Sequence, residues 1–265
     1  LITGGTGSGK TTTMVSMLDY LNATQHRHII TVEDPIEYEL PGVVQSEVDE
    51  KKNYTYATWL RALLRQDPDI IMVWEIRDHE TINIAIEAAL TWHLVVSTIH
   101  TNSASETITR IINMGIQPFL LPAAVNGIIA QRLIRRLCPE CKKPVHVQDL
   151  DAHMQKKIQK ALSRTNKEEL FSRVPKEILQ NPVFYEAVGC EACGNIGYKW
   201  RVGIYEILEI TLNIKKMILD GASATMINEV AINDGMISLE QDGLMKWLNG
   251  LTSLAEVYAA AKEED

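Results

Sequence analysis

The feature that most constrains this chain is a glycine-rich stretch near its start, Gly4-Gly5-Thr6-Gly7-Ser8-Gly9-Lys10-Thr11, followed by Thr12. It matches G-x-x-x-x-G-K-[ST], a loop whose backbone N–H groups surround phosphate groups. Glycine permits the tight curl because it adopts conformations that other residues avoid. We expect a helix to begin at Lys10 with its positive end toward the phosphates. Lys10 is predicted to reach the β- and γ-phosphates and Thr11 to bind Mg²⁺. The stretch therefore predicts a nucleotide-binding protein.

The composition sets limits on the size and class of the protein. A chain of 265 residues holds one large domain, or one core with a smaller module. No apolar run reaches the ~18 residues that a membrane-spanning helix needs. The formal net charge of −8 argues against a broad nucleic-acid surface.

The first residues, Leu1-Ile2-Thr3, have the pattern of a strand that leads directly into the glycine-rich loop. Neither an initiator methionine nor a signal peptide precedes them. We expect the chain to be the C-terminal portion of a longer protein.

Apolar strands alternate with helical patterns along the first half of the chain, which predicts an α/β fold with a mostly parallel sheet. The expected strands cover 28–32, 70–73 and 93–99. The expected helices cover 10–21, 58–65, 79–90, a segment that a capping box starts at 103–106 and Gly115 ends, and 119–137. The last of these would carry Arg132, Arg135 and Arg136 near its negative end.

Polar residues follow each expected strand. Glu33 and Asp34 follow the first, Glu75 follows the second, and His100 follows the third. Ligands of open α/β sheets bind at the carboxyl ends of the strands. We therefore expect these side chains to lie beside the nucleotide.

Four cysteines form two C-x-x-C pairs, Cys138 with Cys141 and Cys190 with Cys193, separated by 48 residues. Four thiolates are the tetrahedral set that Zn²⁺ prefers in structural sites. Two separate redox pairs are the alternative, although the thioredoxin-like context is absent. The intervening segment must loop out and return, and it contains expected helices at 150–162 and 175–179.

The last part of the chain is predicted to be a strand at 201–208 followed by helices. Capping boxes begin at Ser238 and Ser253, each with Gln or Glu three residues later. The sequence is thus expected to divide into a nucleotide-binding core at 1–137, a tetracysteine zinc module with a helical insertion at 138–200, and a C-terminal strand and helical subdomain at 201–265.

Four motifs together resemble the GspE/PilB family of type II secretion and type IV pilus assembly ATPases. They are the glycine-rich loop, an aspartate box at 31–38, a Walker B segment at 69–78 and a histidine box at 93–102. The cysteine pairs and the segment 197–201 are similar to the same family. The resemblance implies a RecA-like core, ATP with Mg²⁺ and Zn²⁺ as cofactors, and a hexameric ring at the cytoplasmic face of the inner membrane.

The resemblance also implies catalytic roles. Glu33 matches the aspartate-box glutamate and is expected to activate the attacking water, while Glu75 holds Mg²⁺ through water; the two roles remain interchangeable. His100 is expected to sense the γ-phosphate or link it to the subunit boundary. A histidine such as His93 is more often structural.

Two arginines and the partners are less directly indicated. Arg77 and Arg110 are candidates for intersubunit contacts, with solvated or capping roles as the alternative. The expected partners are identical subunits and an inner-membrane platform protein, without nucleic acid. Retraction ATPases of the family generally lack the cysteines, so pilus assembly or secretion is preferred. The alternatives are a nucleic-acid translocase and a catalytically impaired structural subunit. We expect the family's trans-acting arginines to belong to a preceding domain.

Three of the five tryptophans, Trp74, Trp92 and Trp200, stand where the family pattern has glycine. At Trp59 and Trp247 glycine is also admissible. An indole at Trp74 is expected to crowd the nucleotide. We hypothesise that these tryptophans come from UGA codons that the source organism reads as glycine. UGG codons would contradict this.

Overall fold

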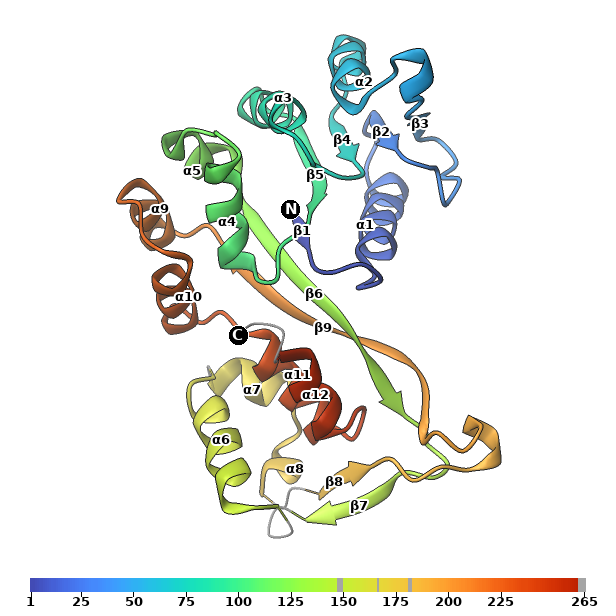
Figure 1. The fold of residues 1–265 in the computed structure, drawn as a ribbon, viewed down its shortest axis with the longest axis vertical. Coiled ribbons are helices and arrows are strands. Elements are labelled where there is room, and N and C mark those ends of the chain that lie inside the picture. The colour runs from blue at the N-terminus through green and yellow to red at the C-terminus, as the bar shows by residue number, and fades with distance from the viewer. Residues whose placement is uncertain (147–149, 166, 181–182, 262–265) are drawn as a thin grey trace. The chain divides into compact units, whose positions relative to one another are not determined.

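The computed structural model describes residues 1–146, 150–165, 167–180 and 183–261 (Figure 1). Its chain forms two compact units. The first contains Leu1–Ile129 and Leu208–Asn228, and the second contains Ala130–Ile207 and Glu229–Asp265. The predicted divisions at 138–200 and 201–265 include residues 147–149, 166, 181–182 and 262–265, which lie outside the described residues.

A parallel sheet organises the first unit. Its strands are β1 Ile2–Thr3, β2 Ile29–Glu33, β3 Val44–Glu47, β4 Ile70–Val73 and β5 Leu94–Ile99. They lie in the sheet in the order β3-β2-β4-β5-β1, and each pair of neighbouring strands in this order is parallel. In the sheet order, β6 Gly127–Leu137 and β9 Tyr198–Glu209 follow β1. The predicted mostly parallel sheet is confirmed.

Helices follow the strands of the first unit as the alternating pattern predicts. They are α1 Lys10–Thr24, α2 Tyr56–Leu63, α3 His79–Leu90, α4 Ala104–Asn113, α5 Leu121–Ala124 and α9 Leu212–Leu219, and α10 Ala224–Asn233 begins here. Every residue of β2 and β4 is buried. Met14 and Leu18 of α1 pack with them in one apolar cluster. Burial on both faces explains why these strands are continuously apolar.

The predicted helix at 119–137 is wrong. The chain instead forms a 3₁₀ turn at Pro118–Leu120, the short helix α5, and the strand β6. Along β6 the side chains at 128, 130, 132 and 134 are buried, which follows the period of two of a strand, and Gln131 is buried as well. The spacing of apolar residues at 128–137 fits both the helical period of about 3.6 residues and the strand period of two. Pairing decides between them, because the Ile129 N–H donates to the Leu1 carbonyl at 2.8 Å. Arg132, Arg135 and Arg136 therefore lie on a strand and not at the end of the predicted helix.

The second unit combines a small antiparallel sheet with helices. β7 Lys143–His146 pairs with β8 Val183–Glu186. The helices are α6 Ala152–Ser163, α7 Lys167–Arg173, α8 Lys176–Gln180, α11 Leu239–Leu248 and α12 Leu254–Ala261. Phe184 stacks on Trp247 with ring centroids 3.7 Å apart, so α11 covers β8. Among the described residues no helix is long and apolar enough to cross a membrane.

The two predicted capping boxes have different outcomes. Ser238 and Gln241 form a complete box at the start of α11, as predicted. At α12, Ser253 caps the Glu256 N–H, but the Glu256 carboxylate binds Arg135. The second box is therefore only half formed, because a stronger charged partner takes the carboxylate.

Candidate nucleotide site and cysteine cluster

The glycine-rich loop has the backbone geometry that its sequence predicts. Gly4, Gly7 and Gly9 have φ values of 144°, 74° and 87°, in the region that favours glycine. Helix α1 begins at Lys10, directly after Gly9. A Cβ atom added at Gly5 or Gly7 would meet no heavy atom within 4 Å, so the loop borders open space. An anion in that space would face the first N–H groups of α1.

Lys10 lies across this loop. Its ammonium donates to the carbonyls of Gly4 at 2.8 Å and Gly5 at 3.0 Å. Burial lowers the pKa of Lys10, and the nearby Glu75 carboxylate opposes that shift. The positive charge is thus held between the loop and the Walker B strand end.

The parallel sheet gathers the predicted site residues at one edge. The neighbouring strands β2, β4, β5 and β1 all run in the same direction, so their carboxyl ends meet. Glu33 ends β2, Glu75 follows β4, His100 follows β5, and Gly4 follows β1. Residues spread over the first hundred positions therefore share one site.

Glu75 is fixed from both sides of its carboxylate and is only 6% exposed. His100 Nε2 lies 2.7 Å from Oε1. Arg77 donates to Oε2 from Nε at 2.7 Å and from Nη2 at 2.5 Å. Hydrogen bonding to Glu75 raises the pKa of Arg77. The Arg77 side chain is 60% exposed, as the solvated alternative expects, and its guanidinium holds the buried Glu75 carboxylate in place. An intersubunit contact of Arg77 stays a prediction.

Glu33 is 1% exposed and is also held by hydrogen bonds. Its Oε1 accepts from the Thr31 hydroxyl at 2.6 Å and from the Gln45 amide at 2.9 Å. Gln45 belongs to β3, whose sequence gave no recognised strand pattern. Its register opposite Thr31 on β2 is what brings the amide to the carboxylate. Sequence reasoning therefore missed Gln45.

Tyr56, the first residue of α2, is a second residue that sequence reasoning missed. Its hydroxyl is buried and has no hydrogen-bond partner among the described residues. Burial raises the pKa of Tyr56, and the charges of Asp34, Glu75 and Glu33 raise it further against the influence of Arg77. A neutral hydroxyl thus lies close to the acidic strand ends. An orphaned buried donor at this place is the signal that identifies it.

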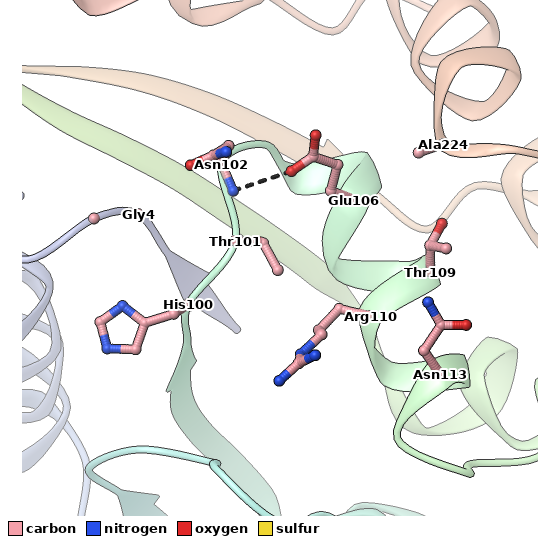
Figure 2. A pocket seen from close by; sticks show the side chains of 10 residues that line it. Gly4, His100, Thr101, Asn102, Glu106, Thr109, Arg110, Asn113 and Ala224 are labelled. Atoms are coloured by element: carbon pink, nitrogen blue, oxygen red, sulfur yellow. Dashed lines mark hydrogen bonds between the residues drawn. The ribbon is translucent and has the colours of Figure 1, made fainter. Parts of the chain in front are cut away.

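A pocket of about 450 Å³ opens beside the glycine-rich loop (Figure 2). Arg110 of α4 lines it, as do His100 and Asn102 of the histidine box. The Asn102 N–H donates to Glu106 Oε2 at 3.1 Å, which fixes the start of α4. The full lining is Gly4, Gly5, His100, Thr101, Asn102, Glu106, Thr109, Arg110, Asn113 and Ala224. Figure 2 shows Gly4 and His100 on one side and the side chains of Glu106, Thr109, Arg110 and Asn113 along α4 on the other.

His93 takes no part in this edge. Its Nδ1 lies 2.9 Å from the Ala88 carbonyl and 3.1 Å from the Thr91 hydroxyl, both at the end of α3. It therefore ties the end of the helix to the start of β5. This is the structural role expected for such a histidine.

The four cysteines of the second unit form one cluster. All four Sγ atoms lie within 4.8 Å of one another. The separations are 3.9 Å for Cys138–Cys190 and for Cys141–Cys193, and 3.8 Å for Cys190–Cys193. A tetrahedral ion with metal–sulfur bonds of about 2.3 Å requires sulfur atoms about 3.8 Å apart. The donor set therefore fits a four-coordinate metal.

Backbone groups support the same sulfur atoms. Burial alone would raise the pKa of Cys193, but the N–H groups of Cys190 and Gly197, each 3.2 Å from its sulfur, lower the pKa to about 6. Burial raises the pKa of Cys190 to about 12. The gathering of both pairs favours one metal site over two separate redox pairs.

Comparisons with known proteins agree with the geometry. Residues 1–259 match the family model described as "Type II/IV secretion system protein". The chain is 45% identical over 257 residues to the type IV pilus assembly ATPase PilB of Myxococcus xanthus, covering 97% of this chain and 42% of that protein. It is 44% identical over 264 residues to type II secretion system protein E of Dickeya dadantii, covering 100% of this chain and 48% of that protein.

A solved structure resembles the fold. The crystal structure of the pilus retraction motor PilT with bound ADP has a TM-score of 0.67 and 30% identity, and the match covers 98% of this chain and 60% of that one. The chain spans less than half the length of the two curated relatives named above. With its motifs in order and a match over nearly its whole length, the chain belongs to the GspE/PilB group of type II/IV secretion system proteins.

Proposed function

We propose that this chain is the ATP-hydrolysing part of a motor subunit that powers type IV pilus assembly or type II protein secretion. One observation carries the proposal: a single edge of the parallel sheet brings together the phosphate-binding loop, Glu33, Glu75 and His100. The family relatives named as PilB and secretion protein E support it.

Nucleotide binding rests on the loop and Lys10. The N–H groups of residues 4–12 would surround the phosphates, and Lys10 would move from its loop carbonyls to the β- and γ-phosphate oxygens. The Thr11 hydroxyl and, through water, Glu75 would hold Mg²⁺. Hydroxyl and carboxylate oxygens are the ligands that this ion prefers. The ion would neutralise the charge that develops on the phosphates.

Hydrolysis requires a water molecule placed in line with the γ-phosphate. The oxygen of this water forms a bond to phosphorus as the bond to the ADP oxygen breaks, and a carboxylate takes the water proton. We assign that role to Glu33, because Thr31 and Gln45 fix its carboxylate. Glu75 remains the alternative base, although Arg77 and His100 already engage both of its oxygens.

His100 connects two parts of the site. Its ring binds Glu75, and it lines the pocket beside Gly4 and Gly5. A γ-phosphate in the loop would compete with Glu75 for the imidazole. His100 is therefore proposed to report the phosphate to Glu75 and to the pocket that contains Arg110.

The cysteine cluster is proposed to hold Zn²⁺. Zinc would stabilise the fold of the second unit by joining the two C-x-x-C turns, since a closed four-thiolate site leaves no position for substrate. Of the GspE/PilB functions, assembly or secretion is preferred because the retraction ATPases generally lack these cysteines.

The working assembly is proposed to be a homo-hexamer that acts on an inner-membrane platform protein from the cytoplasmic face. The net charge of −8 disfavours the nucleic-acid translocase. A catalytically impaired subunit would follow if Trp74, which precedes Glu75, disturbed the site.

The test is steady-state ATP hydrolysis by the natural full-length protein and its Glu33→Gln and Glu75→Gln variants. We expect Glu33→Gln to lower kcat by about 100-fold or more while nucleotide binding persists. Glu75→Gln should instead weaken the dependence on Mg²⁺. The reverse pattern would exchange the two roles. DNA-stimulated hydrolysis would favour the translocase, and a natural protein without turnover would contradict the proposal.

A further inference from the structure

Two tryptophans have a backbone conformation that bulky residues avoid. Trp92 has a φ of 74° and Trp200 a φ of 67°. The other described non-glycine residues with positive φ are Asn53, Asp67 and Asn195. Asn and Asp tolerate this left-handed region, whereas the Cβ of a large side chain crowds its own backbone there. The two tryptophans are therefore the exceptions among the described residues.

Trp92 occupies the position after a helix end where glycine is normally found. Helix α3 ends at Leu90, Thr91 caps it, and Trp92 is the next residue. The His93 N–H donates to the Ala88 carbonyl at 3.2 Å, which is the six-residue bond of a Schellman motif. In this motif the left-handed residue is usually glycine.

Four other helices of this protein end with the same bond and the same conformation, and each has glycine there. The bonds run from Ile116 to Ile111, from Ala222 to Met217, from Met236 to Ala231 and from Leu251 to Lys246. The left-handed residues are Gly115, Gly221, Gly235 and Gly250. Of the five described helices that end in this way, four have glycine as the left-handed residue and α3 has Trp92.

Trp200 interrupts an extended segment. It lies within β9 Tyr198–Glu209, where its neighbours have strand conformation. A left-handed residue inside a strand is typical of a glycine-containing bulge. The same backbone requirement therefore occurs in a different kind of element.

Packing does not compensate for either conformation. Trp92 is 98% exposed and Trp200 is 65% exposed. The contact that accompanies Trp200 is the Lys199 ammonium, 5.0 Å from its ring. By contrast, Trp247 is 2% exposed, lies inside α11 and stacks on Phe184. The indole ring of Trp247 is packed in the core, whereas those of Trp92 and Trp200 bury little surface.

We propose that positions 92 and 200 are glycine in the natural protein, encoded by UGA codons that the source cell reads as glycine. Trp74, the third tryptophan at a family glycine, would share the codon. Its φ lies outside the left-handed region, and its side chain packs against the core cluster. The backbone geometry therefore supports glycine at positions 92 and 200. Glycine at position 74 is proposed only because its codon would be the same. The proposal is independent of ATP hydrolysis.

The test is mass spectrometry of the protein isolated from its source cells. Cleavage after glutamate gives peptides 88–106, 192–206 and 241–256, which separate positions 92, 200 and 247. We expect glycine at 92 and 200 and tryptophan at 247, which is the internal control. Tryptophan at either 92 or 200 overturns the proposal.

The coding DNA provides a second, independent readout. UGA at codons 92, 200 and 74, with UGG at codon 247, is the expected result. UGG at codon 92 or 200 contradicts the proposal. Because both measurements use the natural protein or its gene, neither depends on whether a variant folds.

Discussion

The nucleotide edge of the first unit and the cysteine cluster of the second unit each unite residues distant in sequence, but by different means. At the edge, parallel strands and backbone N–H groups do the positioning, and side chains such as Arg77 and Gln45 refine it. In the cluster, four sulfur atoms from two short turns converge. The first arrangement is maintained by a buried sheet, whereas the second requires something to hold four thiols together.

The two sites are therefore vulnerable in different ways. Loss of one side chain at the edge should remove chemistry and leave the fold, because the strands are buried independently of it. Loss of the proposed metal or of one sulfur should remove structure.

Metal removal should have the largest effect. A structural zinc site contributes on the order of 10 kcal/mol of folding free energy. A strong chelator, or Cys193→Ser, is expected to unfold the second unit around the cysteines while β2 and β4 stay protected. Hydrogen exchange across both units measures this. Equal protection of residues 138–146 before and after chelation would show that the cysteine cluster does not depend on a metal.

Lys10→Ala should remove chemistry without removing structure. Loss of this charge at the phosphates is expected to lower ATP hydrolysis by roughly 100-fold or more. The midpoint of thermal unfolding should change little. Lys51→Ala, at an exposed position, is the matched control. A large loss of stability in Lys10→Ala would show that the edge depends on its side chains as the cluster does.

The difference in stability between glycine and alanine replacements should have opposite signs at positions 92 and 247. In recombinant protein, Trp92→Gly is expected to be more stable than Trp92→Ala by about 1 kcal/mol, since alanine keeps the left-handed strain. At Trp247, inside a helix, alanine should be the more stable replacement by about 1 kcal/mol. Chemical denaturation of the four variants measures both differences. The same sign at both positions would contradict the backbone argument.

Tyr56→Phe tests the orphaned hydroxyl at the edge. If it donates to a water or phosphate oxygen beside the acidic strand ends, its loss should lower kcat about fivefold, the value of one hydrogen bond. The free energy of unfolding should not fall, because the hydroxyl has no hydrogen-bond partner among the residues that the structure describes. Tyr54→Phe, exposed and stacked on Trp59, should change neither quantity. Unchanged kcat in Tyr56→Phe would exclude the hydroxyl from the site.

Glu256 gives the smallest effect, a pH dependence confined to the second unit. Burial raises its pKa, but hydrogen bonds from Arg135 outweigh this and the net pKa is lowered. Its stabilisation is therefore complete above the ordinary glutamate pKa of about 4.3 and is lost as the pH falls through the folded-state value. Since more than half of the Arg135 side chain is exposed, we expect the ion pair to contribute less than about 1 kcal/mol to the free energy of unfolding.

The measurement compares unfolding of the natural sequence with that of Glu256→Gln between neutral and acidic pH. The difference should shrink as the pH falls. A constant difference would mean that packing, and not charge, explains the effect.

The sequence predicted best what depends on local pattern. The bounds of α3 and β4 and the start of α1 at Lys10 agree with the structure, because caps and glycines act over a few residues. The edge itself was predictable because parallel strands must align their carboxyl ends. The family motifs placed Glu33, Glu75 and His100 within it.

What the sequence did not predict depends on pairing between distant segments. The strand β6 was taken for a helix because its isoleucines fit both periods, and only pairing with the first strand distinguishes them. Gln45 reaches Glu33 through the register of β3, and Arg77 reaches Glu75 through the path after β4. No spacing rule encodes those contacts.

The separation of the two cysteine pairs has a consequence for synthesis on the ribosome. Glu33, Glu75, His100 and the loop all precede Cys138 in the sequence, so the edge can form before the cysteine cluster. Cys138 must wait for Cys190, 52 residues later, before their thiols can meet. Closing so long a loop costs entropy that the proposed metal would offset. A ribosome paused between these pairs would therefore expose a half-site, open to the wrong metal or to oxidation.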